Sequence, residues 1–267
     1  MKKNSINLAV CAALVALSSQ AVATTVIGTL PGWTLNGNGG YQTSTDGVVD
    51  VAPGQTIDFV TSNGGISGNN LGSPGTNGST ATSAFTATAG DLLSFSFKYV
   101  TSDGSGFPDY AWAEVFKQGS TSPYAVLFTA GTNPTIGATV PASNLPSIPI
   151  TATLNPAIGS IPFNAGGPTW SALGSYSGAC WAAGCGYTDW VQASYAIADT
   201  GNYNLVFGVA NANDQIFDSG LAWTGAKIAD TEIGDVPEPA ILSLLAISFA
   251  GFSAIRRFIN SKVNLVA

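Results

Sequence analysis

Residues 91–99 read DLLSFSFKY, and this stretch decides the fold class. Large apolar side chains at positions 93, 95, 97 and 99 alternate with Ser94, Ser96 and Lys98. Such a period of two residues is typical of a β-strand that buries one face and exposes the other. We therefore predict a strand here, with its apolar face in the core of a β protein.

The same pattern recurs along the chain. Residues 202–210 place Tyr203, Leu205, Phe207 and Val209 on one face, and residues 110–117 do so with three aromatic side chains. Further strand candidates are residues 25–30, 47–51, 56–60, 79–88, 124–130, 190–198 and 220–229. About ten short strands punctuated by Gly, Asn and Pro, with no helical pattern between them, predict an all-β sandwich or barrel.

Two stretches interrupt this rhythm. Residues 62–79, SNGGISGNNLGSPGTNGS, predict a loop, and residues 139–168 contain six prolines. Neither should hold a central strand, because Pro lacks the ladder donor and Gly lacks a packing side chain. The body of the chain, residues 24–235, includes both stretches and is long enough for one good-sized domain.

The body is strongly acidic. Of the basic residues only Lys98, Lys117 and Lys227 fall within residues 24–235, against fourteen acidic residues, which gives a net charge of −11. A surface of this sign repels nucleic acid and anionic lipid headgroups. We expect no nucleic-acid partner; divalent cations or neutral polymers suit such a surface.

The N-terminus predicts export. Lys2 and Lys3 precede the apolar stretch INLAVCAALVAL, and an Ala-Val-Ala triplet ends at Ala23. This is the pattern of a cleavable signal peptide over residues 1–23, which a signal peptidase would remove.

The C-terminus predicts a membrane anchor. Val236, Pro237, Glu238 and Pro239 come directly before the apolar run AILSLLAISFAGFSAI, residues 240–255. A helix of this length reaches most of the way across a hydrocarbon core. Arg256 and Arg257 follow it, so the C-terminus should stay cytoplasmic, with the body outside.

This order of a P-E-P triplet, an apolar span and an arginine pair resembles the PEP-CTERM sorting signal of Gram-negative bacteria. The resemblance covers residues 236–267. It implies transient insertion in the inner membrane, processing by an exosortase, and release to the cell surface or the extracellular matrix. A plain C-terminal anchor that is never cut is the alternative.

The body carries a further resemblance. Residues 203–227, YNLVFGVANANDQIFDSGLAWTGAK, are similar to the closing strand pair of PEP-CTERM surface proteins whose bodies look like carbohydrate-binding jelly rolls. Residues 95–116 look like the matching strand, loop and strand. The resemblance implies a jelly-roll-like β-sandwich and names no ligand.

Two cysteines remain after removal of the signal peptide. Cys180 and Cys185 enclose four residues, in GACWAAGCGYTDW. In an oxidising compartment such a pair most simply forms a disulfide. A metal or redox pair is the alternative, although the spacing is not C-x-x-C and the chain has no His.

The absence of His also bears on catalysis, because the usual base of a Ser or Cys nucleophile is missing. A glycosidase needs only two carboxyl groups, for which Asp109, Glu114 and Asp189 are the candidates. Nothing in the sequence brings two of them together. We therefore expect a protein that is not an enzyme.

Asp103, Asp109, Asp214 and Asp218 fall in the Gly- and Asn-containing loops SDGSGFPDY and ANANDQIFDSG. Oxygen-rich loops suit Ca²⁺, which takes six to eight oxygen ligands. A structural calcium ion joining the two loops is one interpretation. The other is that these residues only form turns, which Asp and Asn favour.

The six tryptophans admit two roles. Trp112 and Trp223 follow strand alternation, so we assign them to the core. Trp170, Trp181 and Trp190 lie near turns and the cysteine loop, and are candidates for exposed faces on which sugar rings stack. Burial of these three is the alternative.

Three functions remain. The first is a non-enzymatic exported β-sandwich protein of the cell surface or matrix that contacts polysaccharide. The second is a structural coat protein without a specific ligand. The third is a carboxylate-dependent enzyme acting on glycans.

Overall fold

The computed structural model describes residues 25–234 except 53–54, 73, 133–138, 144 and 146–147. This part is built of β-strands with a single short 3-10 helix, η1. The elements are β1 Thr25–Ile27, β2 Thr34–Asn36, β3 Asn38–Gln42, β4 Ile57–Thr61, β5 Ile66–Ser67, β6 Gly75–Ala87, β7 Leu92–Thr101, β8 Tyr110–Lys117, β9 Ala125–Gly131, β10 Thr153–Asn155, β11 Phe163–Ala165, η1 Ser171–Tyr176, β12 Gly186–Thr188, β13 Val191–Ala196, β14 Gly201–Ala212, β15 Ser219–Ile228 and β16 Thr231–Glu232.

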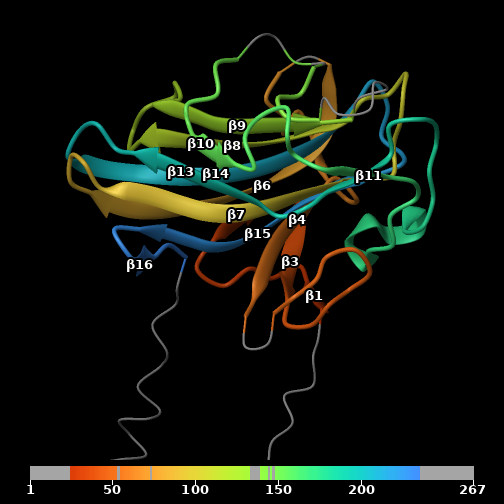
Figure 1. The fold of residues 1–267 in the computed structure, drawn as a ribbon, viewed down its shortest axis with the longest axis horizontal. Coiled ribbons are helices and arrows are strands. Elements are labelled where there is room, and N and C mark those ends of the chain that lie inside the picture. The colour runs from red at the N-terminus through yellow and green to blue at the C-terminus, as the bar shows by residue number, and fades with distance from the viewer. Residues whose placement is uncertain are drawn as a thin grey trace, which may run out of the picture.

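The strands form two antiparallel sheets (Figure 1). Sheet A has the order β1-β3-β4-β15-β7-β12-β11, with β13 also paired to β7, β10 to β13 and β16 to β15. Sheet B has the order β2-β6-β14-β8-β9, with β5 paired to β6. The predicted all-β fold with a sandwich-like arrangement is confirmed.

The central core lies between the two sheets. The four alternating side chains of β7 from Leu93 to Tyr99 are buried there, as are those of β14 from Tyr203 to Val209. Phe97 of sheet A stacks on Phe128 of sheet B, with ring centroids 3.7 Å apart. The period-two pattern therefore predicted the buried face of both strands correctly.

Each sheet also buries part of its outer face. On sheet A, the Trp170 ring packs edge-on against Phe59 and so close to Gly220 that a Cβ there would lie 2.3 Å from the ring. On sheet B, Tyr110 and Trp112 form a smaller cluster with residues that include Ala142 and Leu145 of the Pro-rich segment. Trp112 and Trp223 are both buried, as predicted, but only Trp223 lies in the central core.

Two predictions about local structure are wrong. Residues 47–51 form no strand: the segment makes one bridge, Asp46 to Val49, and lies over the outer face of sheet A. Residues 75–79 are not a loop but the start of β6, because β14 extends far enough to pair with them, Ala210 with Gly78 and Val209 with Ser79. Among its described residues, the Pro-rich segment holds the short strands β10 and β11 alone, each paired on one side, as expected.

Among the described residues, no helix has the length and apolar character needed to cross a membrane. The predicted signal peptide, residues 1–23, and the predicted sorting signal with its helix, residues 236–267, lie outside the described part.

Candidate functional site at the loop end

One end of the sandwich, here called the loop end, is built from residues 102–109, 180–185 and 213–218. The loops 102–109 and 213–218 are adjacent because they extend from β7 and β15, which pair directly, Thr101 with Ser219. Ser102 ties them together: its N–H and its Oγ donate to the carbonyl of Asp218, at 3.2 and 2.8 Å. The third loop, residues 180–185, is bonded to the first, because the Trp181 N–H donates to the carbonyl of Ser102 at 3.0 Å.

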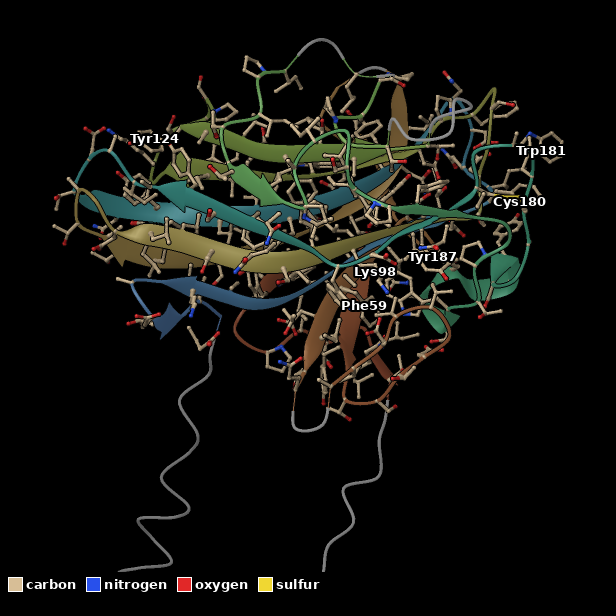
Figure 2. All side chains as sticks on the ribbon, viewed as in Figure 1. Phe59, Lys98, Tyr124, Cys180, Trp181 and Tyr187 are labelled. Atoms are coloured by element: carbon tan, nitrogen blue, oxygen red, sulfur yellow. A yellow bond between two sulfur atoms is a disulfide. The ribbon has the colours of Figure 1, made fainter. Side chains whose placement is uncertain are left out.

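The third loop is closed by the predicted disulfide. Cys180 and Cys185 are bonded, with their Cα atoms 5.6 Å apart. Figure 2 shows Cys180 and Trp181 at one extremity of the molecule and Tyr124 at the other. So short a loop removes little entropy from the unfolded chain, about 2 kcal/mol at most. Its main effect is local, because it fixes the segment that carries Trp181.

Trp181 belongs to a cluster of four rings, here called the aromatic platform. Its side chain is 51% exposed. The ring lies 5.2 Å from Phe217 and 6.2 Å from Phe107, and Phe217 lies 4.7 Å from Tyr176. The rings come from four segments of the chain, and all except Trp181 are half-buried. The platform is therefore an exposed aromatic surface held in place by its neighbours.

Three members of the platform were not among the predicted site residues. Phe107 and Phe217 each stand as a large ring inside a polar turn sequence, SDGSGFPD and NANDQIFDSG, and this contrast is the signal that could have found them. Phe217 also has a φ of 57°, which is a strained conformation for a bulky residue. Strain of this kind is often retained at functional sites.

The other two tryptophans proposed for sugar stacking lie elsewhere. Trp170 is fully buried, and its Nε1 donates to Gln42 Oε1 at 2.9 Å, so the prediction of an exposed ring is wrong. Trp190 is half-buried on sheet A, where its Nε1 donates to Asp50 Oδ1 at 3.1 Å. Of the three candidates, only Trp181 presents a largely exposed face.

The four predicted calcium ligands do gather beneath the loop end. Asp109 is fully buried: Oδ1 accepts the Ala212 N–H at 2.9 Å and Oδ2 accepts the Ser219 hydroxyl at 2.6 Å. Burial, and then the charge of Asp103, raise the pKa of Asp109 well above its ordinary value. Both oxygens of this carboxyl group are thus already engaged.

Asp103 lies at the centre of the cluster. Burial, helped by the charges of Asp214 and Asp218, raises the pKa of Asp103 to about 8 despite a hydrogen bond from Gly104 that lowers it. Burial likewise raises the pKa of Asp218 and of Asp214. Asp109 belongs to the same group, because the charge of Asp103 also acts on it. The four carboxyl groups therefore repel one another when ionised.

No basic side chain compensates this group within the described part of the chain. Its three lysines are paired with other carboxylates, Lys98 with Asp50 at 2.8 Å, Lys117 with Asp199 at 2.7 Å and Lys227 with Asp230 at 3.1 Å. Nor do three or more acidic or cysteine side chains of the described residues converge closely enough to hold a metal ion by themselves.

The three carboxylates considered for catalysis are not arranged as a pair. Asp109 faces inward just before β8, whereas Glu114 lies on the outer face of sheet B with Trp112, roughly 17 Å further along at the usual rise of a strand. Asp189 is exposed and accepts a hydrogen bond from Asn164 at 3.0 Å.

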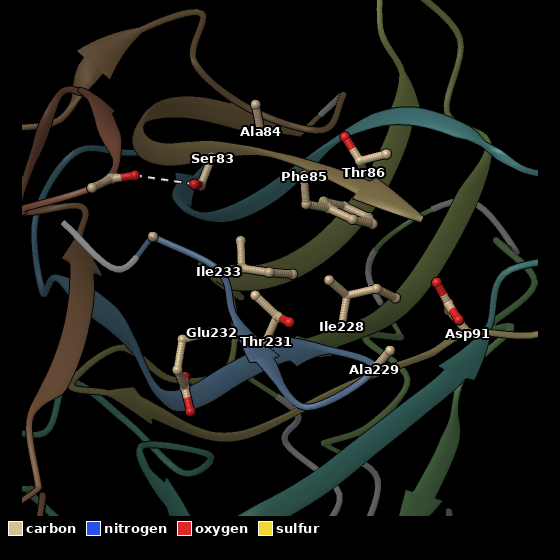
Figure 3. A pocket seen from close by; sticks show the side chains of 12 residues that line it. Ser83, Ala84, Phe85, Thr86, Asp91, Ile228, Ala229, Thr231, Glu232 and Ile233 are labelled. Carbon is tan, nitrogen blue, oxygen red and sulfur yellow. Dashed lines mark hydrogen bonds between the residues drawn. The ribbon is translucent and has the colours of Figure 1, made fainter. Parts of the chain in front are cut away.

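A groove lies at the opposite end of β15 from the loop end. Its volume is about 710 Å³, and it runs between β6 and the β15–β16 hairpin. Phe85, Ile228 and Ile233 point into it, with Asp91 and Glu232 at its border (Figure 3). A second cavity of about 700 Å³ adjoins it and includes Asp58, whose pKa burial raises to about 7.

Comparison of this chain with protein-family models, with curated proteins and with solved structures finds no match. The function proposed below is therefore argued from the residues and their geometry.

Proposed function

We propose that the protein is an exported, non-enzymatic β-sandwich protein that binds polysaccharide through the aromatic platform. One observation carries the proposal: Trp181 exposes half of its surface while Phe107 and Phe217 hold its ring. A flat, fixed aromatic face matches the apolar face of a pyranose ring, and its fixation reduces the entropy lost on binding.

The surroundings of the platform favour a neutral ligand. The net charge of −11 over residues 24–235 disfavours nucleic acids and acidic polymers. Serine, asparagine and aspartate side chains flank the rings in the same loops and can bond to sugar hydroxyl groups. We propose a neutral polysaccharide as the ligand class and a jelly-roll-like topology for the sandwich.

Export is the second part of the proposal. The signal-peptide pattern and the tail, with Val236, Pro237, Glu238 and Pro239 before the apolar run and Arg256 and Arg257 after it, support delivery through the inner membrane to an exosortase. The mature protein would then reach the cell surface or the matrix. Mass spectrometry of the intact mature protein is expected to give the mass of a chain without residues 1–23 and without the apolar run 240–255.

The binding test uses the purified full-length protein in detergent, sedimented with neutral polysaccharide from the matrix of the producing cells. Trp181→Ala should weaken binding about fivefold or more, since stacking contacts of this kind contribute about 1 kcal/mol or more. Leu92→Ala is the matched control: Leu92 is also 51% exposed but lies at the far end of β7. Equal binding by Trp181→Ala and the wild type contradicts the proposal, and no binding by either favours the coat protein.

A further inference from the structure

Asp103 carries an oxygen that the fold leaves unused. The side chain is fully buried, and Oδ1 accepts the Gly104 N–H at 2.6 Å. Oδ2 is also buried and has no hydrogen-bond partner among the described residues. A buried carboxylate oxygen without a partner costs free energy, so native proteins seldom keep one without a reason.

The other carboxyl groups of the cluster differ in how much of their bonding capacity remains. Both oxygens of Asp109 are occupied, and Asp218 Oδ1 already accepts from Ser62 and Asn211, each at 3.2 Å. Asp214 is half-buried, and its Oδ1 accepts one long bond from the Ile216 N–H, at 3.3 Å. Asp103 Oδ2 is therefore the one carboxyl oxygen of the cluster that is buried without a partner among the described residues, and Asp214 has bonding capacity left at a less buried position.

We propose that the loop end binds one Ca²⁺ ion, with Asp103 and Asp214 as its charged ligands. Asp109 and Asp218 lie behind these ligands and keep their own hydrogen bonds without contacting the ion. Because no three acidic side chains converge within the described part, carbonyl oxygens of the two loops and water would complete the coordination shell. Calcium accepts such mixed oxygen ligands, whereas structural zinc sites are usually built from the Cys and His ligands that this site lacks.

The ion would supply the positive charge that the fold does not. The three lysines of residues 25–234 are engaged with other carboxylates, so this part of the chain supplies no cation to the cluster. The ion would also join the loops that carry Phe107 and Phe217, and so fix the platform. This inference does not depend on the proposed binding of polysaccharide.

The test measures calcium binding directly. Full-length protein is stripped with a chelator and titrated with CaCl₂ by calorimetry and by equilibrium dialysis. We expect one Ca²⁺ per chain, with an affinity in the range of extracellular modules, about 0.1–1 mM. Asp103→Asn and Asp214→Asn, which keep the side-chain shape, should each weaken binding about tenfold or more. Asp199→Asn, an exposed position at the far end of the sandwich, should bind as the wild type does.

Thermal unfolding separates this proposal from a purely structural role of Asp103. In chelator, Asp103→Asn should unfold at or above the wild-type temperature, because one of four repelling groups is removed, and calcium should no longer raise it. A wild type that binds no calcium at several times 1 mM, or an Asp103→Asn variant with wild-type affinity, would overturn the proposal.

Discussion

Lys98 and Asp103 are five positions apart, on β7 and on the loop that follows it, and both are buried, yet their surroundings differ. Lys98 Nζ donates to Asp50 Oδ1 and to the Val48 carbonyl, each at 2.8 Å. It also lies 5.5 Å from the ring centroids of Tyr187 and Trp190. Figure 2 shows Lys98 and Tyr187 together on sheet A, away from Trp181. The fold thus provides the Lys98 ammonium group with a carboxylate, a carbonyl oxygen and two aromatic rings.

The loop end shows the opposite arrangement. Asp103 has one satisfied oxygen and one unsatisfied oxygen, and its charged neighbours repel it. At Lys98 the fold supplies the opposite charge itself, and the largely exposed Asp50 has a lowered pKa, because the hydrogen bond and charge of Lys98, with a hydrogen bond from Trp190, outweigh its slight burial. The difference is that the fold itself provides the partners of Lys98 on the outer face of sheet A, whereas at the loop end it leaves one buried carboxyl oxygen, Asp103 Oδ2, without a partner among the described residues.

The largest expected effect tests the structural half of this comparison. Trp170→Ala should lower the free energy of unfolding by about 4 kcal/mol, because it leaves a cavity between Phe59 and Gly220. Calcium affinity should be unchanged in the folded fraction. Denaturant unfolding measures the first and calorimetry the second. A loss of less than 1 kcal/mol would show that the outer-face cluster is not part of the stabilising core.

Glu114, a buried carboxyl group away from the loop end, should make the stability of the fold depend on pH. Burial raises the pKa of Glu114 from 4.5 to about 7, against a hydrogen bond from Trp112 that lowers it. The folded state therefore binds the proton of the Glu114 carboxyl group more tightly than the unfolded state does. The protonated group's contribution to the free energy of unfolding is fully present below pH 4.5 and is lost as pH rises through 7. The loss is roughly 3 kcal/mol.

Glu114→Gln should remove that loss. The variant is expected to be more stable than the wild type at pH 8 and to show no such gain at pH 4, in urea unfolding at each pH. Asp58→Asn should behave in the same way, since burial raises the pKa of Asp58 to about 7. A difference between Glu114→Gln and the wild type that does not change with pH would contradict the assignment.

Removing charge should have opposite signs in the two regions. Lys98→Met keeps most of the apolar stem but loses the bonds to Asp50 and Val48, and should cost about 1–2 kcal/mol. The figure is modest because the Asp50 side chain is 65% exposed and stays hydrated. Asp103→Asn in chelator should cost nothing or stabilise. If both substitutions destabilise equally in thermal unfolding, the distinction between the two regions fails.

The sequence predicted what depends on local pattern. Alternation located β7, β8 and β14 and the buried face of β7 and β14, because one strand face meets the core whatever the topology. The four aspartates could be grouped because their loops adjoin the best strands, and pairing of Thr101 with Ser219 does bring those loops together. The disulfide was predicted from the spacing of Cys180 and Cys185 and from the expected export of the chain.

What failed depends on contacts distant in sequence. Trp170 sits in a Pro- and Gly-rich segment that reads as a surface loop, but this segment folds back over sheet A and meets Gly220, fifty positions away. Residues 47–51 look like a strand because their valines are apolar, yet they pack on that same cluster without pairing. Phe217 stands out in the sequence only as a ring inside a polar turn, and its contacts with Trp181 and Tyr176, which give it a place in the platform, come from segments distant in sequence.

The smallest expected effect on stability is at Trp181, and it is the sharpest contrast with Trp170. Trp181→Ala should change the free energy of unfolding by less than about 1 kcal/mol, because half of the side chain is already in water and its ring contacts lie at the surface. Denaturant unfolding beside Leu92→Ala, an equally exposed position, gives the comparison. A loss of more than about 2 kcal/mol would make the aromatic platform a satellite core, and weakened polysaccharide binding by the variant would then report unfolding of the loop end. With stability intact, the same weakening assigns the contact to the ring itself, so one tryptophan is needed for folding and the other only for binding.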